Sequence, residues 1–147
     1  MPDFTELSAK GDLFHVGIKA VLTNESGEIL ILRKAAEQAH GGPFWDLPGG
    51  RVQGGDPEAT LRREVLEETG IQEITVGEPL GSSIKPAAIQ IGDVHIGLTL
   101  LTYRCTVPGC PVPLLSDEHT SYAWLPVPEA LDKLHGNFPD SLFRGLR

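Results

Sequence analysis

The sequence has few features of a secreted, disulfide-bonded or membrane-spanning protein, and each absence excludes a class. Only two of its 147 residues are cysteine, which excludes a fold built on disulfide bonds. We expect both, Cys105 and Cys110, to be reduced structural thiols. No run of about 18 apolar residues occurs, so no membrane-spanning helix is expected. The Met1–Gly11 segment lacks a basic stretch followed by an apolar one, so we expect no secretory signal and a cytoplasmic protein.

Positive charge is also scarce. Lys and Arg number 12 against 20 Asp and Glu, which gives a net charge of −8. Proteins that bind polymeric nucleic acid usually carry a basic face, so this class is disfavoured. An acidic protein can still bind an anionic small molecule when a metal ion stands between the two. The length fits one domain over residues 1–147, and a composition of 40% hydrophobic and 22% charged residues is ordinary for a folded chain.

Hydrophobic patterns and turn residues predict a single domain of mixed α and β structure. The segments 14–22 and 28–33 flank the turn cluster Asn24–Gly27, so they are expected to form a hairpin. A short apolar piece at 44–47 ends at Pro48-Gly49-Gly50. Further strands are predicted at 94–107 and 120–125, strand and turn at 72–80, short helices at 128–135 and 139–146, and loops at 35–43 and 108–113.

One helix is predicted over residues 57–69. Asp56 is a suitable N-cap, Pro57 suits the first helical position, and Gly70 suits the C-cap. Leu61 and Val65 are four residues apart and form one narrow apolar stripe. The rest of this segment is rich in charge.

Three carboxylates share one face of this helix. Glu64, Glu67 and Glu68 stand at positions i, i+3 and i+4, where like charges cost about 0.2–0.5 kcal/mol per pair. Two of them also lie near the helix C-terminus, where the helix dipole disfavours anions. A hard divalent cation explains this arrangement, because Mg²⁺ binds carboxylate oxygens and keeps positions open for water and substrate phosphates.

The alternative is a solvated acidic face that Arg62 and Arg63 partly neutralise. The segment before the helix favours the cation site. Gly49 and Gly50 bring a bare backbone toward the helix, and residues without side chains permit close approach to a ligand.

These residues resemble the Nudix hydrolases, whose box reads G-x5-E-x7-R-E-U-x-E-E-x-G-U, with U a bulky aliphatic residue. The second half matches fully over residues 63–71, and residues 45–50 resemble the family's lead-in. The first half departs from the box. Asp56 stands where the family has glutamate after Gly50, and six residues, not seven, separate Asp56 from Arg63.

The resemblance implies an α+β fold, an α/β/α sandwich with a mixed central β-sheet. It implies that Glu67 and Glu68 are metal ligands, and that Glu64 is either a ligand or the general base. The carbonyl of Gly49 would be another ligand, and Arg63 would orient the carboxylates by charge-assisted hydrogen bonds. Glu64, Glu67 and Arg63 are thus the expected catalytic residues.

A later segment, residues 116–119, resembles one in which many members carry a further metal ligand. This assigns Glu118 to the metal, with a surface loop acid as the alternative. The neighbouring His119 is a weaker candidate for assistance near the metal.

Substrate-binding candidates lie near the second strand. Arg33 and Lys34 resemble a basic pair that touches phosphate in the family, with a solvated pair at a strand end as the alternative. Trp45 or Phe44 would stack on a base, although an aromatic residue here is more often part of the core.

The activity implied is Mg²⁺- or Mn²⁺-dependent hydrolysis of a nucleoside diphosphate linked to another moiety, such as a nucleoside triphosphate or ADP-ribose. The metal would lower the pKa of bound water, and a carboxylate would take its proton. Small members of this length often act on nucleoside triphosphates, as the MutT type does. The alternative is a catalytically weak nucleotide-binding sensor, favoured by the short box loop. The expected partner is a small nucleotide, not a nucleic-acid polymer or a membrane. Homodimers are common in the family, but the sequence shows no interface.

Overall fold

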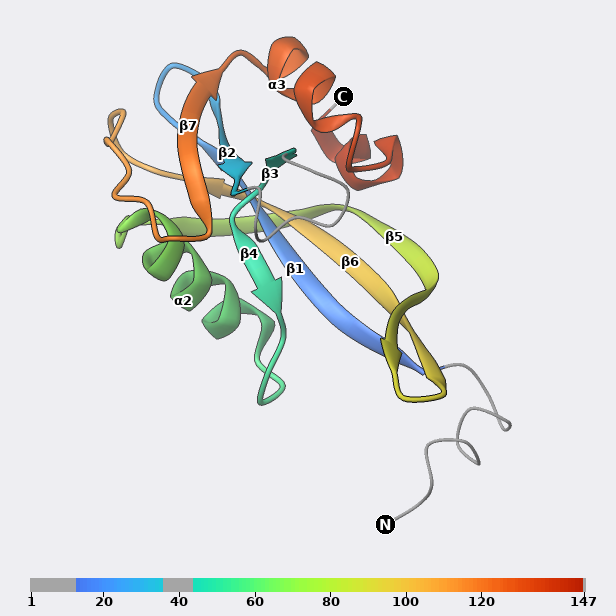
Figure 1. Ribbon diagram of the computed structural model, residues 1–147. Coiled ribbons are helices and arrows are strands. Elements are labelled where there is room, and N and C mark those ends of the chain that lie inside the picture. Colours follow the sequence, from blue (N-terminus) through green and yellow to red (C-terminus); the bar gives the residue numbers. More distant parts are fainter. Residues whose placement is uncertain (1–12, 36–43, 147) are drawn as a thin grey trace.

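A mixed β-sheet is the central element of the computed structural model, which describes residues 13–35 and 44–146 (Figure 1). The strands are β1 (Phe14–Thr23), β2 (Ile29–Lys34), β3 (Trp45–Asp46), β4 (Gly49–Arg51), β5 (Thr75–Ile91), β6 (Val94–Thr106) and β7 (His119–Leu125). The helices are α2 (Pro57–Thr69), α3 (Val127–Leu134) and the 3-10 helix η2 (Asp140–Leu146). The strand order is β3-β2-β1-β6-β5, with β4 paired to β1 and β7 to β2. β1 and β6 run parallel, which makes the sheet mixed.

Helices cover both faces of this sheet, as Figure 1 shows. Leu61 and Val65 of α2 pack against Ile18 on one face. On the other face, Val21 packs with Leu134 of α3 in a cluster that also contains η2 residues. Alternate residues of β1 therefore serve two separate cores, as the period of a strand requires. The expected α+β architecture of three layers is confirmed.

The first two strands form the predicted hairpin, with Thr23 paired to Ile29. Asn24 closes the turn, because its Oδ1 accepts hydrogen bonds from the backbone N–H groups of Ser26 and Glu28, both at 3.0 Å. An asparagine side chain that bonds its own turn in this way fixes the chain reversal. The hairpin delivers β1 to the centre of the sheet, where the site is built.

Helix α2 has the predicted bounds. The Asp56 carboxylate accepts a hydrogen bond from the Ala59 N–H at 3.2 Å, and Gly70 ends the helix with φ 73°. Leu61 and Val65 are fully buried, so the predicted apolar stripe is the face that meets the sheet. The carboxylates lie on other sides of the helix. Glu64 and Glu68 are on the side that turns toward β4.

The segment after α2 departs from prediction. A strand and turn were expected over residues 72–80, but β5 begins at Thr75, continues to Ile91 and forms a long antiparallel hairpin with β6. Pro79 and Pro86 are tolerated because β5 is an edge strand, where an N–H can be left out of the ladder. Shifts of register beside Pro79 and between Lys85 and Ile89 absorb the irregular sequence. Sheet position, not local pattern, thus determines this strand.

The remaining predictions agree with the described residues to within a few positions. α3 is one residue shifted from 128–135, and residues 140–146 form a 3-10 helix in place of the expected α-helix. Residues 36–43, most of the expected loop at 35–43, lie outside the described residues. Cys105 and Cys110 are free thiols, as expected, and burial raises the pKa of Cys105 to about 12. None of the helices in the described ranges is long and apolar enough to cross a membrane.

The cap of α2 yields a stability prediction. Asp56→Ala removes the acceptor for the Ala59 N–H and should lower the free energy of unfolding by about 1 kcal/mol. Urea denaturation measures this change. Asp132→Ala, which removes an acid from the exposed side of α3, serves as the control and should lose much less. Equal losses for the two variants would contradict the capping role.

Candidate active site

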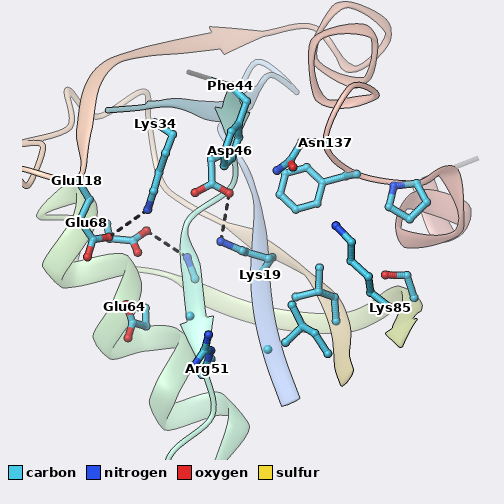
Figure 2. Close-up of a pocket in the computed structure, with 18 of the residues that line it drawn as sticks. Lys19, Lys34, Phe44, Asp46, Arg51, Glu64, Glu68, Lys85, Glu118 and Asn137 are labelled. Carbon is cyan, nitrogen blue, oxygen red and sulfur yellow. Dashed lines mark hydrogen bonds and ion pairs between the residues drawn. The ribbon is translucent and has the colours of Figure 1, made fainter. Parts of the chain in front are cut away.

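A pocket of about 800 Å³ opens over β1 and β6, between the carboxylate side of α2 and residues 137–139 (Figure 2). Besides Phe44 and Gly50, it brings together five of the residues predicted to form the site. These are Lys34, Gly49, Glu64, Glu68 and Glu118. They come from β2, β4, α2 and the loop before β7, so segments far apart in the chain meet here.

The two glycines of β4 set the distance between backbone and helix. Gly49 has φ 152°, and a Cβ there would overlap the carbonyl oxygen of Ile18 on β1. A Cβ on Gly50 would lie 2.7 Å from Cδ of Glu64 and 2.8 Å from its Oε1. The predicted close approach of a bare backbone to the carboxylates is thus present; backbone atoms require glycine at position 49, whereas position 50 faces the Glu64 side chain.

Glu68 is the most buried carboxylate of α2, with 4% of the residue exposed. Its Oε2 accepts a hydrogen bond from the Gly49 N–H at 3.2 Å. Burial raises the pKa of Glu68 to about 8, although Lys19 and the Gly49 N–H favour the charged form. A carboxylate that is so poorly solvated is one that a bound cation would stabilise.

Glu64 lies one turn earlier and faces the same pocket. Its Oε1 is 3.4 Å from an amino nitrogen of Arg63. Burial raises the pKa of Glu64; Arg63 opposes this shift, while Glu67 and Glu118 add to it. The repulsion predicted for the acidic face is therefore present around Glu64.

Glu118 reaches the pocket from the loop before β7. Its Oε2 is 3.8 Å from the Lys34 ammonium, and half of its side chain is exposed. The backbone of Glu118 is fixed to the residue that follows β2, since its carbonyl accepts a hydrogen bond from the Ala35 N–H at 2.8 Å. Glu118 and Lys34, both predicted site residues, thus form an ion pair at the rim of the pocket.

The donor chemistry of the pocket fits a hard divalent cation. Glu64, Glu68 and Glu118 offer carboxylate oxygens, and Gly49 offers a backbone carbonyl, which are the ligands that Mg²⁺ prefers. Each of the three carboxylates has a present partner: Arg63, the Gly49 N–H and Lys34. Among residues 13–35 and 44–146, no three acidic, His or Cys side chains are gathered as a ready-made metal site.

Four of the predicted site residues lie outside the pocket lining. Glu67 is exposed and pairs with Arg63 at 3.6 Å, so these two lie on the outer side of α2. Trp45 packs against the second core cluster, with the Arg33 guanidinium 5.4 Å from its ring centroid. Lys133 lies 5.8 Å from the same ring, so both cations stack on Trp45. The roles assigned to these four residues stay predictions, while Phe44 does line the pocket.

Sequence reasoning missed several polar side chains of the pocket, which are Lys19, Asp46, Arg51, Lys85 and Asn137. Lys19 carried a signal, because it is a charge in the otherwise apolar stretch 18–22. Its ammonium is 3.1 Å from Asp46 Oδ1. The other oxygen of Asp46 is 3.2 Å from Nε2 of His119, whose ring is fully buried. His119 thus contacts Asp46 and is not part of the pocket lining.

The pocket concentrates positive charge in an acidic protein. Its lining includes four of the 12 Lys and Arg residues of the chain. Four carboxylates face them across the same space. This mixture suits an anionic ligand that arrives with a cation, even in a protein with a net charge of −8.

Comparison with known proteins agrees with this geometry. A family model described as the NUDIX domain matches residues 13–146. A MutT-like protein of Streptomyces ambofaciens is 31% identical over 123 residues, covering 83% of this chain and 70% of that protein. The CTP pyrophosphohydrolase of Escherichia coli (strain K12) is 29% identical over 117 residues, covering 79% of each. The crystal structure of a MutT protein from Methanosarcina mazei Go1 has a TM-score of 0.66 at 26% identity, covering 82% of this chain and 83% of that one.

The glycine pair yields a prediction about unfolding. Gly49→Ala should cost at least about 2 kcal/mol, because an alanine is strained at this φ and its Cβ overlaps backbone. Gly50→Ala should cost less than half as much, because its Cβ meets the movable end of the Glu64 side chain. Urea denaturation of both variants measures the difference. Equal costs would show that Gly50 is fixed by backbone and not by Glu64.

The buried acid yields a prediction about pH. Although burial opposes it, Lys19 and His119 hold the pKa of Asp46 at about 2, below its ordinary 3.8. A lowered pKa means that Asp46 stabilises the folded state above about pH 4, and that this stabilisation is lost as the pH falls toward 2. The stability gap between wild type and Asp46→Asn should therefore shrink over that interval, by about 2 kcal/mol. Unfolding free energies from pH 6 to 2 test it; a constant gap would contradict the assignment.

Proposed function

Because this chain belongs to the Nudix hydrolase family, we propose that it is a divalent-metal-dependent pyrophosphohydrolase that cleaves a nucleoside diphosphate linked to another moiety. The family itself acts on diphosphate bonds, and the metal and the substrate are the proposed parts. The observation that carries the proposal is the meeting of Glu64, Glu68 and Glu118 with four cationic side chains around one pocket.

The proposed metal is Mg²⁺ or Mn²⁺. Glu64, Glu67, Glu68, Glu118 and the Gly49 carbonyl would hold it. When bound, the ion supplies charge neutralisation on the diphosphate and a lowered pKa for bound water. Since Glu67 now lies on the outer side of α2, Glu68 and Glu64 are the ligands best supported by position.

The remaining roles fall to side chains around this centre. Glu64 is within reach of the pocket and serves as ligand or general base. Arg63 contacts both Glu64 and Glu67, so it would orient these carboxylates. Lys34 at the rim, whose ammonium is 3.8 Å from Glu118, would contact substrate phosphate. Arg33 and Trp45 are the weaker substrate candidates, because they stack on each other outside the lining.

A nucleoside triphosphate is the substrate that we place first. The Escherichia coli relative that aligns over 79% of both chains is named a CTP pyrophosphohydrolase. The mixed charges of the pocket suit a polyphosphate that carries a cation. ADP-ribose and dinucleoside polyphosphates are the other substrates to be tested.

One observation favours the second candidate function, a nucleotide-binding sensor of low activity. Asp56 stands at the acid position of the short box, yet it caps α2 and is not among the residues that line the pocket. Its carboxylate is therefore not placed to assist at the metal. The presence of all three acids of the second half, Glu64, Glu67 and Glu68, favours the enzyme.

Turnover measurements distinguish these functions. The protein would be incubated with Mg²⁺ and a panel of nucleoside triphosphates, oxidised ones included, ADP-ribose, nucleotide sugars and dinucleoside polyphosphates. Glu68→Gln should lower kcat at least about 100-fold, because it removes a charged ligand, and Glu67→Gln should have a smaller effect. Glu58→Gln is the matched control: it lies on the same helix, pairs with Arg62 at 3.3 Å, and should keep full activity.

Two outcomes would count against the enzyme. If nothing in the panel turns over while a nucleotide raises the melting temperature, the sensor function is the correct one. If Glu68→Gln and Glu58→Gln have equal activity, the pocket is not the site of reaction.

A further inference from the structure

Asp46 lines the pocket and contacts Lys19, Leu47 and His119; Figure 2 shows its contact with Lys19. Its Oδ1 accepts hydrogen bonds from the Lys19 ammonium at 3.1 Å and from the Leu47 N–H at 2.8 Å. Its Oδ2 is 3.2 Å from Nε2 of His119, the residue after Glu118. Only 7% of the Asp46 side chain is exposed. A buried acid with so many partners holds its neighbours in fixed positions.

Lys19 is the partner whose position has chemical consequences. Its ammonium bonds Asp46 and the Leu47 carbonyl, each at 3.1 Å, and it lines the same pocket as Glu64 and Glu68. Burial would lower the pKa of Lys19, but the negative charges of Asp46, Glu68 and Glu64 raise it above its ordinary value. A cation in this position can turn toward the glutamates and neutralise the charge that a metal ion needs.

We propose that Asp46 is a positioning residue: as the counter-ion of Lys19, it holds the ammonium against Leu47 and away from Glu68 and Glu64. Without a competing ammonium beside them, these carboxylates then stay open to a divalent cation. The inference rests on the proposed function in one respect, that Glu64 and Glu68 bind the metal.

The ion pair is not needed to set the path of the backbone. β1 and β4 pair directly, with Lys19 opposite Gly49 and Ile18 opposite Gly50. The Ala20 N–H also donates to the Pro48 carbonyl at 2.8 Å. Replacing both members of a buried ion pair by uncharged groups is often tolerated, whereas removing one member leaves a charge without its partner. The double variant is therefore expected to fold.

Direct measurement of Mn²⁺ binding tests the proposal without turnover. Asp46→Asn should weaken Mn²⁺ binding on the order of 10-fold, because Lys19 is released toward the glutamates. Adding Lys19→Met to this variant should restore the affinity to within about threefold of wild type, because the competing charge is gone. Lys19→Met alone should not weaken binding. Electron paramagnetic resonance of free Mn²⁺ gives the dissociation constants, and thermal melts establish that each variant is folded.

A matched control removes an ion pair elsewhere. Glu78→Gln breaks the ion pair between Glu78 of β5 and Arg104 of β6, in which Oε1 is 2.7 Å from Nε. Neither residue lines the pocket. It should leave Mn²⁺ affinity unchanged. Any comparable loss in this control would overturn the assignment of the effect to Asp46.

The outcomes separate this inference from the proposed function. If the wild type binds no Mn²⁺, the proposed function fails, and this inference fails with it. If the wild type binds and Asp46→Asn binds equally well, only the role of Asp46 is overturned. A double variant as weak as Asp46→Asn, or a Lys19→Met variant weaker than wild type, would show that the pair acts through structure and not through charge. If Asp46→Asn does not fold, the Mn²⁺ affinity of Lys19→Met distinguishes a role through charge from a role through structure.

Discussion

The close approach of β4 to α2 is the constraint on which the pocket depends. Gly50 leaves no room for a Cβ beside the Glu64 carboxylate, and Gly49 leaves none beside the Ile18 carbonyl. The Gly49 N–H can consequently bond Glu68 from the backbone. Two acids of α2, Glu64 and Glu68, thus become part of a site because the facing strand has no side chains at two positions.

Charge is the second organising feature. Glu68 is buried at a cost that is evident in its pKa of about 8, and Lys19 only partly offsets that cost. Arg63 forms an ion pair with Glu64, and Lys34 forms one with Glu118. Such an arrangement holds these acids near one another around the pocket. The same cations would be available to a substrate phosphate.

Local patterns were sufficient for the elements with strong start and stop signals. Helix α2 begins after Asp56 and ends at Gly70, because an N-cap acid, a proline at the first position and a glycine beyond the last turn act within a few residues. The β1–β2 hairpin likewise follows from the turn at Asn24. β5 was only partly foreseen, since Pro79 and Pro86 disfavour a strand unless it lies at a sheet edge. Edge position is a property of the whole sheet, so no window of sequence contains it.

The sequence by itself determined the family, the acidic face of α2 and the need for glycine before it, because each of these depends on the spacing of neighbouring residues. The tertiary structure decided which acids share a pocket. It separates Glu67 from Glu68, although the two are adjacent in sequence, because successive residues of a helix point in different directions. It brings Lys19, Asp46 and His119 together from β1, β3 and β7, three strands separated by most of the chain. Contacts of that kind arise from strand order and register, which depend on the packing of the entire sheet.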